Sequence, residues 1–287
     1  MTLYVLFLVI CAALLHAVWN LISKKANGKM PFIWLMYIGS TLIYLPLLVY
    51  HVAGSEKFQF TVPMLWFSIS SAILHIAYFL ILQEGYRRSD LSVVYPTARG
   101  SAPLLSSIAA ILVLRETFKY SVALGLVLIL AGVLIITGLK FTSGDKKITT
   151  GVFWGTLTGL FIAIYTLNDA IAIKNYHLSP IQLTFSSNAI SILLLIPFLF
   201  GKGTEIKREL AEHKWSILAI ALLSPAAYIL VLQALEYAPL SVIAPARETS
   251  ILIGVFMGSK ALNEKDGKKR IIASILILGG IVFLSLT

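Results

Sequence analysis

The chain has 287 residues, of which 58% are hydrophobic and 13% are charged, and its mean hydropathy is +0.89. This apolar content exceeds that of a water-soluble globular domain and predicts an integral membrane protein. The net charge of +10 does not indicate nucleic-acid binding, because the basic residues fall in short clusters between apolar runs. The single cysteine, Cys11, excludes an internal disulfide framework and a Cys-based metal site.

Apolar segments of about 20 residues, long enough to cross a hydrocarbon core of roughly 30 Å as helices, recur along the chain. The first has no basic residues before it and is followed by lysines, so we interpret it as a retained helix rather than a signal peptide. No period-two alternation indicates strands. We predict an all-α integral membrane protein with ten transmembrane helices, at residues 3–23, 31–51, 62–83, 91–113, 120–140, 150–172, 179–200, 215–235, 240–261 and 270–287.

Lysine and arginine are distributed unequally between the two sets of loops. Loops after the odd-numbered spans carry 17 of them, and loops on the other side carry 4. The positive-inside rule makes the rich side cytoplasmic and places both termini outside a bacterial-type inner (plasma) membrane. The rich loops hold Lys24, Lys25, Lys29, Arg87, Arg88, Lys140, Lys146, Lys147, Lys202, Lys207, Arg208, Lys214, Lys260, Lys265, Lys268, Lys269 and Arg270, and the poor loops hold Lys57, Arg115, Lys119 and Lys174.

The two halves of the chain share one register. "LSVVYP" at 91–96 matches "LSVIAP" at 240–245 at an offset of 149, and "LRE" at 114–116 matches "LNE" at 262–264 at an offset of 148. Five helices per copy is an odd number, so the second copy is expected to enter the bilayer inverted, as in many secondary transporters. We predict a first five-helix repeat at 1–140, a connecting loop at 141–149 and a second repeat at 150–287.

Three segments carry a family resemblance: "LLHAVWNLISKKA" in the first span, "SVVYPTARGSAPLLSSIAAILVLRE" in the fourth and "YAPLSVIAPARETSILIGVFMGSKALNE" around the ninth. Over essentially its whole length the chain resembles the ten-helix EamA family of the drug/metabolite transporter superfamily. The resemblance implies a transporter, in a family whose members carry amino acids, nucleotide precursors, organic acids and other metabolites. The "HAVWN" segment is also similar to members associated with phosphonate use. Several members are described with termini inside, whereas the Lys/Arg distribution here predicts termini outside.

Two arginines stand within predicted spans. Arg99 is about eight residues into the fourth span, close to the membrane centre, and Arg247 and Glu248 occupy the corresponding positions of the ninth. An arginine at that depth costs at least about 2.5–3.5 kcal/mol unless it finds a partner or a wet cavity. Two interpretations are open: Glu248 pairs with an arginine in a structural clamp, or a guanidinium faces a cavity and binds a carboxylate, phosphate or phosphonate.

Each of these charged positions follows a proline. Pro96 and Pro245 remove a helix donor and are predicted helix breaks, which at membrane depth either line a cavity or serve as packing kinks. Tyr95, adjacent to Pro96 and one turn before Arg99, is a predicted substrate-binding residue.

The first and sixth spans hold further candidates. His16 and Asn20 share a helix face and, with Trp19, are predicted to line the substrate site; the alternative is a helix–helix hydrogen bond and an interfacial tryptophan. Asp169 is either a span-end residue that reaches the interface or, if buried, a proton carrier, with Glu248 as a second coupling candidate. The remaining polar residues in spans are expected to form ordinary interhelical bonds or interface anchors, among them His75, Tyr78, Gln83, Tyr165, Asn188, Tyr228 and Gln233.

No HExxH, GxSxG, Walker-type glycine loop or Cys/His cluster appears, so the sequence offers no machinery for hydrolysis or ATP-driven pumping. We predict a secondary active transporter, working by alternating access, for a small anionic or zwitterionic metabolite such as an amino acid, organic acid or phosphonate. An intramembrane lipid-modifying enzyme and a passive metabolite channel are the alternatives.

No catalytic residue, metal or cofactor is expected, and coupling to H⁺ or Na⁺ is left open. The expected partners are the substrate and the lipid bilayer, without nucleic acid. Both a monomer and a homodimer are compatible with the sequence.

The predicted orientation has a direct test. A green fluorescent protein fused after Thr287 should stay dark in cells, because the positive-inside rule exports the C-terminus. Whole-cell fluorescence, with alkaline phosphatase fused at the same point as the reciprocal reporter, measures this. Bright fluorescence with an inactive phosphatase would reverse the topology.

Overall fold

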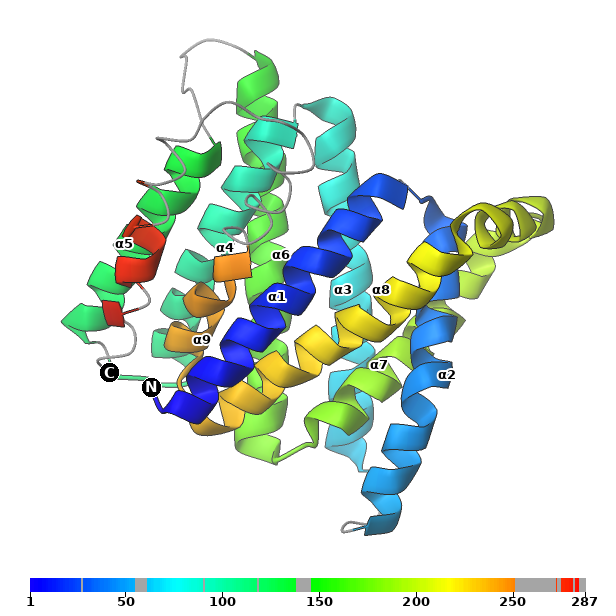
Figure 1. The fold of residues 1–287 in the computed structure, drawn as a ribbon, viewed down its shortest axis with the longest axis horizontal. Coiled ribbons are helices and arrows are strands. Elements are labelled where there is room, and N and C mark those ends of the chain that lie inside the picture. The colour runs from blue at the N-terminus through cyan, green and yellow to red at the C-terminus, as the bar shows by residue number, and fades with distance from the viewer. Residues whose placement is uncertain are drawn as a thin grey trace.

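Most residues that the structure describes lie in α-helices (Figure 1). The structure is a computed structural model that describes residues 1–26, 28–54, 61–89, 91–117, 119–137 and 146–250, together with 272, 275–280 and 282–283. The helices are α1 (Leu3–Ala26), α2 (Met30–Gly54), α3 (Val62–Arg88), α4 (Leu91–Val113), α5 (Tyr120–Thr137), α6 (Lys146–Tyr176), α7 (Pro180–Leu195), the 3₁₀ turn η1 (Ile196–Leu199), α8 (Gly203–Tyr237) and α9 (Leu240–Arg247). Residues 272, 275–280 and 282–283, within the tenth predicted span, are also helical.

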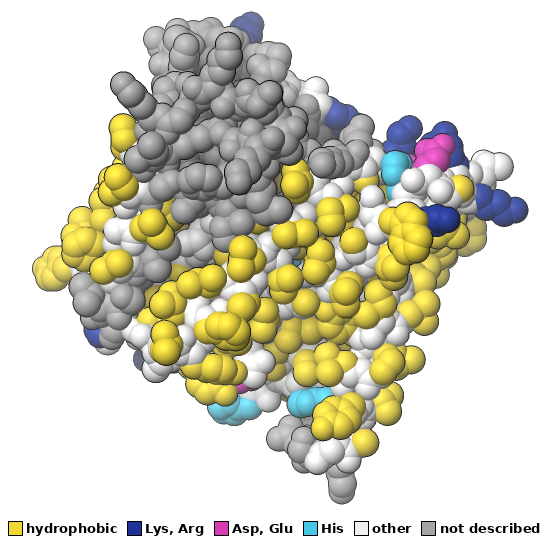
Figure 2. Space-filling model, in the orientation of Figure 1, with side chains coloured by type: hydrophobic (Ala, Val, Ile, Leu, Met, Phe, Trp, Pro, Cys, Tyr) yellow, Lys and Arg dark blue, Asp and Glu magenta, His cyan; other side chains and the backbone are white. Residues whose placement is uncertain are grey.

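Within the described residues, six helices are long and apolar enough to cross a membrane: α1, α2, α3, α6, α7 with η1, and α8. Helices α4 and α5 carry shorter apolar stretches, at 97–113 and 120–132. Apolar side chains such as Leu3, Tyr50 and Phe200 are 83%, 77% and 77% exposed, which suits contact with lipid tails rather than water. Figure 2 shows hydrophobic side chains over most of the described face formed by α1, α2 and α8.

Each main contact between a helix of the first half and a helix of the second half has a counterpart in which the two halves are exchanged. Helix α3 packs on α6 as α8 packs on α1, and α2 packs on α8 as α7 packs on α3. Because each repeat has five helices, a helix of one half corresponds to the helix numbered five higher or lower in the other half, and this correspondence converts α3–α6 into α8–α1 and α2–α8 into α7–α3. The contacts α4–α9 and α2–α7 map onto themselves, so these helices meet at the pseudo-two-fold axis. In Figure 1, α1 and α8 lie side by side across the front of the bundle.

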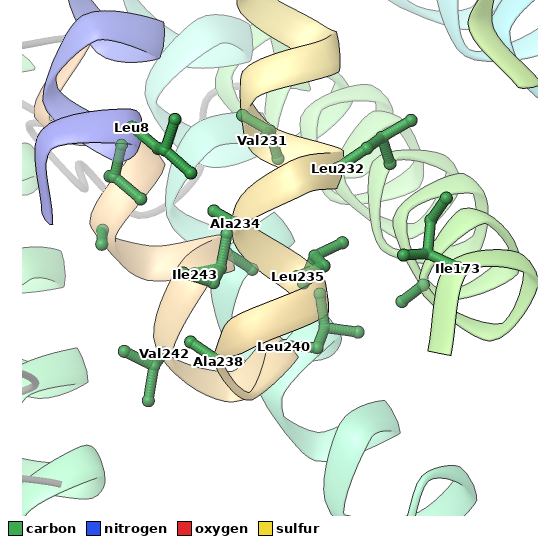
Figure 3. Packing of buried hydrophobic residues seen from close by; sticks show 14 of the residues in the cluster. Leu8, Ile173, Val231, Leu232, Ala234, Leu235, Ala238, Leu240, Val242 and Ile243 are labelled. Carbon is green, nitrogen blue, oxygen red and sulfur yellow. The ribbon is translucent and has the colours of Figure 1, made fainter. Parts of the chain in front are cut away.

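The largest buried apolar cluster joins both halves at one end of the bundle (Figure 3). The close-up shows Leu8 of α1 and Ile173 of α6 near the corner where α8 turns into α9. At that corner Leu235 and Leu240 are 0% exposed. Fully burying a leucine stabilises a fold in water by about 1.5–3 kcal/mol, but in lipid such packing contributes through close van der Waals contact instead.

Predicted spans such as 3–23 and 62–83 agree with the apolar parts of the helices, Leu3–Ser23 and Val62–Leu82, but several helices extend beyond these apolar parts. Arg87 and Arg88 lie in the last turn of α3, where both pair with Glu84, rather than in a loop. The hydrogen bond from Arg88 holds the pKa of Glu84 below its usual range. Helix α6 begins at Lys146, inside the expected connecting loop. A helix needs no apolar residues once it leaves the hydrocarbon, so hydropathy alone does not mark its end.

Helix α8 differs most from its predicted bounds of 215–235. Its 35 residues span about 52 Å, well beyond a bilayer core. The non-helical angles of His213 (φ −122°, ψ 16°) divide it into a charged first part, which includes Lys207 and Arg208, and an apolar second part. The charged part lies at the edge of the bundle in Figure 2. The sequence placed these basic residues in a loop, whereas they belong to a helix.

The predicted helix breaks behave differently from each other. Helix α4 continues through Pro96 without interruption, so the break expected there is absent. Helix α9 ends at Arg247, two residues after Pro245, with Glu248 as its C-cap. The predicted ninth span continues to residue 261, and its part beyond Ser250 lies outside the described residues.

Glycines permit a close approach between the halves where α6 crosses α4. A Cβ at Gly159 would lie 2.9 Å from the carbonyl oxygen of Ala98 and 3.1 Å from the nitrogen of Ala102, and would also overlap the Ser101 hydroxyl. Backbone atoms cannot move aside as side chains do, so only glycine fits this crossing.

We expect Gly159→Ala to destabilise the protein by about 1–3 kcal/mol through overpacking. Gly100→Ala in α4 is the matched control, because its Cβ would meet only the Leu130 Cδ2 atom, at 3.8 Å, an ordinary contact. Thermal unfolding in detergent compares the two variants. Equal midpoints would show that the α4–α6 contact is not this tight.

Candidate functional site

Two arginines and a glutamate form a buried charged triad where α4 meets α9. Nη1 of Arg99 lies 3.4 Å from Oε2 of Glu248, and Nη2 of Arg247 lies 3.6 Å from Oε1 of the same carboxylate. The side chains of Arg99, Arg247 and Glu248 are 18%, 4% and 0% exposed. Two guanidinium groups, one from each half of the chain, thus lie against one carboxylate. The contact of Glu248 with Arg99 and Arg247 is the ion pairing that the structural-clamp interpretation predicted.

The triad lies at the pseudo-two-fold axis. Arg99 and Glu248 are 149 residues apart, the offset that relates the two copies of the "LSV" segment. Equivalent positions of two repeats come into contact only near the axis that relates them. The site between the halves is therefore built from the same helix position used twice.

Part of the triad's hydrogen-bonding capacity is unused. Among the described residues, buried Nε of Arg247 and Oε1 of Glu248 have no hydrogen-bond partner. Burying an unsatisfied donor costs about 1–3 kcal/mol, and more for a charged group. The geometry thus combines a clamp with a guanidinium edge that could bind an anion, so the two interpretations are not exclusive.

Pro245 has a specific local effect on α9. It has no N–H to donate to the carbonyl of Ser241, four residues earlier. That carbonyl accepts a hydrogen bond from the Ser107 hydroxyl of α4 instead, at 3.4 Å. The proline therefore frees an acceptor that links α9 to α4 beside the triad.

The predicted residues of the first helix lie partly at this site. Nε1 of Trp19 donates to Nδ1 of His16 at 3.0 Å, and His16 is within electrostatic range of both Arg99 and Arg247. Asn20 lies in α1, but its side chain is outside the described residues, as are the side chains of Tyr95 and Pro96 in α4.

Asp169 of α6 is buried and 0% exposed, which removes the interface alternative. Its carboxylate accepts hydrogen bonds from the hydroxyl of Ser71 at 3.1 Å, the amide of Asn168 at 2.8 Å and the hydroxyl of Tyr228. Asn168 in turn accepts from the hydroxyl of Ser70 at 2.8 Å. The carboxylate is thus held by neutral donors from α3, α6 and α8.

Aromatic rings surround this carboxylate and extend towards the triad. The His75 ring lies 4.1 Å from that of Tyr165 and 5.3 Å from that of Tyr228, and Tyr78 lies 5.6 Å from Tyr165. Nδ1 of His75 is 2.8 Å from the Ser71 carbonyl, a contact that requires a proton on that nitrogen. We call His75, Tyr78, Tyr165 and Tyr228 the ring cluster.

From the sequence alone, the four residues of the ring cluster were expected to form ordinary interhelical bonds or interface anchors. A usable signal was present in their spacing. Ser71, His75 and Tyr78 follow i, i+4, i+7 on α3, and Tyr165 and Asp169 are four apart on α6, so each set shares one helix face. The sequence alone does not show that this face of α3 and this face of α6 point at each other.

Glu116 connects the halves away from the triad. It accepts hydrogen bonds from the backbone nitrogens of Leu240 (2.7 Å) and Ser241 (3.0 Å) and from the Ser241 hydroxyl (2.7 Å), and lies 3.6 Å from Nζ of Lys174. The N-cap of α9 is Pro239, which has no side-chain acceptor, so a carboxylate from the other half supplies the cap. Arg115, with φ 54°, makes the turn that brings Glu116 there.

No group of three or more His, Cys, Asp or Glu side chains in the described part of the chain could hold a metal ion. The chemistry available is the recognition of a charged or polar molecule by guanidinium, carboxylate and aromatic groups.

A helical membrane bundle with internal two-fold repetition and a charged site at its axis is typical of membrane transport proteins. The model of the EamA-like transporter family matches residues 3–138 and again 149–286. The chain belongs to this family and has two EamA repeats, and it is a multi-pass membrane transporter, not an enzyme. The exact repeat boundaries stay a prediction.

Solved structures support the same fold. One, described only as "Crystal structure of protein", has a TM-score of 0.75 at 13% sequence identity, covering 98% of this chain and 96% of that one. No curated protein matches the chain.

The triad predicts a particular pattern of stability. Glu248→Gln removes the carboxylate that lies between the buried Arg247 and the partly exposed Arg99, and should destabilise the protein by about 3–5 kcal/mol. Adding Arg99→Gln removes one of the stranded charges and should restore part of that loss. Thermal unfolding of the single and double variants measures the coupling; purely additive losses would mean that these side chains do not interact.

Proposed function

We propose that the protein is a secondary active transporter of a small anionic or zwitterionic metabolite, such as an amino acid, organic acid or phosphonate, and that it works by alternating access. The proposal rests above all on one observation: Nε of the buried Arg247 guanidinium has no hydrogen-bond partner among the described residues. The planar guanidinium fork matches a carboxylate or phosphonate.

Substrate would bind at the axis, between the two halves. Arg247 would contact the acidic group, with Arg99 beside it on the facing helix. His16, which is within electrostatic range of the guanidinium groups, would form one wall from α1 together with its hydrogen-bond partner Trp19. Tyr95 and Asn20 are proposed as further contacts from their positions in α4 and α1. The ring cluster would bound the site on the side of α3, α6 and α8.

Two-fold exchange supplies the mechanism for changing access. Because each half contacts the other through equivalent helices, swapping the conformations of the halves would open the axis to the opposite side. In this proposal the transporter resides in a bacterial-type inner (plasma) membrane with both termini outside, and the energy comes from an ion gradient.

A ligand-induced thermal shift tests the site. We expect lactate, methylphosphonate or alanine to stabilise the detergent-purified protein, methylamine to have no effect, and Arg247→Gln to lose the stabilisation. At a ligand concentration of about 100 times Kd the gain is about 2.7 kcal/mol, a shift of several degrees at most.

Arg88→Gln is the matched control, because it removes an arginine that is 58% exposed at the end of α3. It should respond to acids like the parent protein. Stabilisation by methylamine alone, or acid binding that survives Arg247→Gln, would remove the triad from the substrate site.

A further inference from the structure

We propose that Glu116 is a latch: it fastens the start of α9 to the first half of the protein and keeps one end of the bundle closed, so that its release opens a path to the triad. The inference rests on the proposed function, because only a transporter that works by alternating access has to open this end. It adds the residue that holds the closed form. With both termini outside, as proposed, α4 ends and α9 begins on the outer side, so this latch closes the outer path.

The first ground is the set of contacts that Glu116 makes. Oε1 accepts a hydrogen bond from the nitrogen of Leu240, and Oε2 accepts from both the nitrogen and the hydroxyl of Ser241. Nζ of Lys174, in the last turn of α6, lies 3.6 Å from Oε1. Glu116 belongs to the first EamA repeat and its three partners belong to the second. One carboxylate therefore ties two helices of the second half to the first.

The second ground is what the start of α9 covers. Leu240 is 0% exposed and belongs to the largest buried apolar cluster, which joins both halves at this end of the bundle (Figure 3). Ala110 of α4 and Ile173 of α6 belong to the same cluster. The side chain of Glu116 is 11% exposed and thus partly shielded from water, which favours strong charge-assisted hydrogen bonds to N–H groups. The apolar cluster closes this end, and Glu116 holds the start of α9 over it.

The third ground is that polar contacts join α9 to α4 at both of its ends. Beside the latch, the Ser107 hydroxyl of α4 donates to the carbonyl of Ser241 at 3.4 Å. At the other end of α9, Nη1 of Arg99 lies 3.4 Å from the carboxylate of Glu248. The eight residues of α9 measure about 12 Å along the helix axis. The latch and the triad are thus about two helical turns apart on the same short helix.

The consequence is that one contact controls access to the triad from this end. A helix of two turns moves largely as one piece, so separating its start from Glu116 also loosens its other end, where Arg247 and Glu248 lie. The side chains of these two residues are 4% and 0% exposed when the latch is formed. A ligand that enters from this end therefore reaches the triad only after α9 has moved away from α4.

Modification of a reporter cysteine tests the latch without any ligand. Ser107→Cys, in a Cys11→Ala background, places one thiol between α4 and α9, at a position where the serine is 3% exposed. We expect Glu116→Gln to raise the rate at which the charged thiol reagent MTSET modifies this cysteine by about tenfold in the detergent-purified protein. The reason is that an amide replaces the carboxylate and its nitrogen cannot accept a hydrogen bond from α9.

Three further variants separate a latch from ordinary destabilisation. Ser241→Ala removes one of the three hydrogen bonds and keeps the carboxylate, so the rate should rise by about threefold. Glu236→Gln removes an exposed carboxylate from the last turn of α8, close to the start of α9, and should leave the rate unchanged. Ser106→Cys moves the thiol to the adjacent residue, which is 0% exposed and bonds within α4, and should stay protected when combined with Glu116→Gln.

The possible failures differ. A Ser107→Cys thiol that stays equally protected in Glu116→Gln and Ser241→Ala overturns the latch, while the proposed substrate site stands. Equal increases for Ser107→Cys and Ser106→Cys would mean that Glu116 only stabilises the fold, and they also overturn the latch. An increase confined to Ser107→Cys supports the latch, and it does so even if lactate, methylphosphonate and alanine all fail to bind, a result that would count against the proposed function alone.

Discussion

The need to neutralise charge away from water is the constraint on which this structure depends. Glu248 lies between Arg99 and Arg247, and its carboxylate offsets the cost of burying guanidinium charge inside the bundle. That arrangement requires α4 and α9 to meet, which brings the two repeats together at their common axis. Close packing of α4 on α6, made possible by Gly159, then holds α4 in place, and Glu116 fixes the start of α9 from the opposite half. The charged site and the bundle architecture therefore depend on the same helix contacts.

The helical bundle could be predicted from the sequence because membrane spans are recognised by their length and apolar composition alone. Apolar runs of span length and a shared register between the halves are properties of residue order alone, and both the fold class and the family follow from them. The sequence did not predict how far helices continue beyond their apolar parts, as at Lys146 and in the charged first part of α8. Outside the hydrocarbon, capping and charge decide where a helix ends, and these leave a weaker trace in hydropathy.

The candidate site was predicted in part. Arg99, Arg247 and Glu248 were identifiable because charge within an apolar span is rare. Whether Asp169 was buried depended on which way its helix faced, and the answer came only from Ser71 and Tyr228, almost 100 and 59 residues away in the chain. The ring cluster was missed for the same reason: tyrosine and histidine are common at membrane interfaces, and only contact between separate helices distinguishes a cluster from scattered anchors.

The ring cluster also breaks the symmetry that the repeats establish. At the offset of 148, Asp169 corresponds to Leu21. In α3 and α8, where "LQ" at 82–83 matches "LQ" at 232–233 at an offset of 150, His75 corresponds to Pro225 and Tyr78 to Tyr228, so neither Asp169 nor His75 has a polar counterpart in the other half. An exchange of conformations between unequal halves does not return the molecule to an equivalent state. The inward-open and outward-open forms must then differ in free energy. The unloaded protein therefore rests mainly in one of these two forms, so the two sides of the membrane are not equivalent for this duplicated fold.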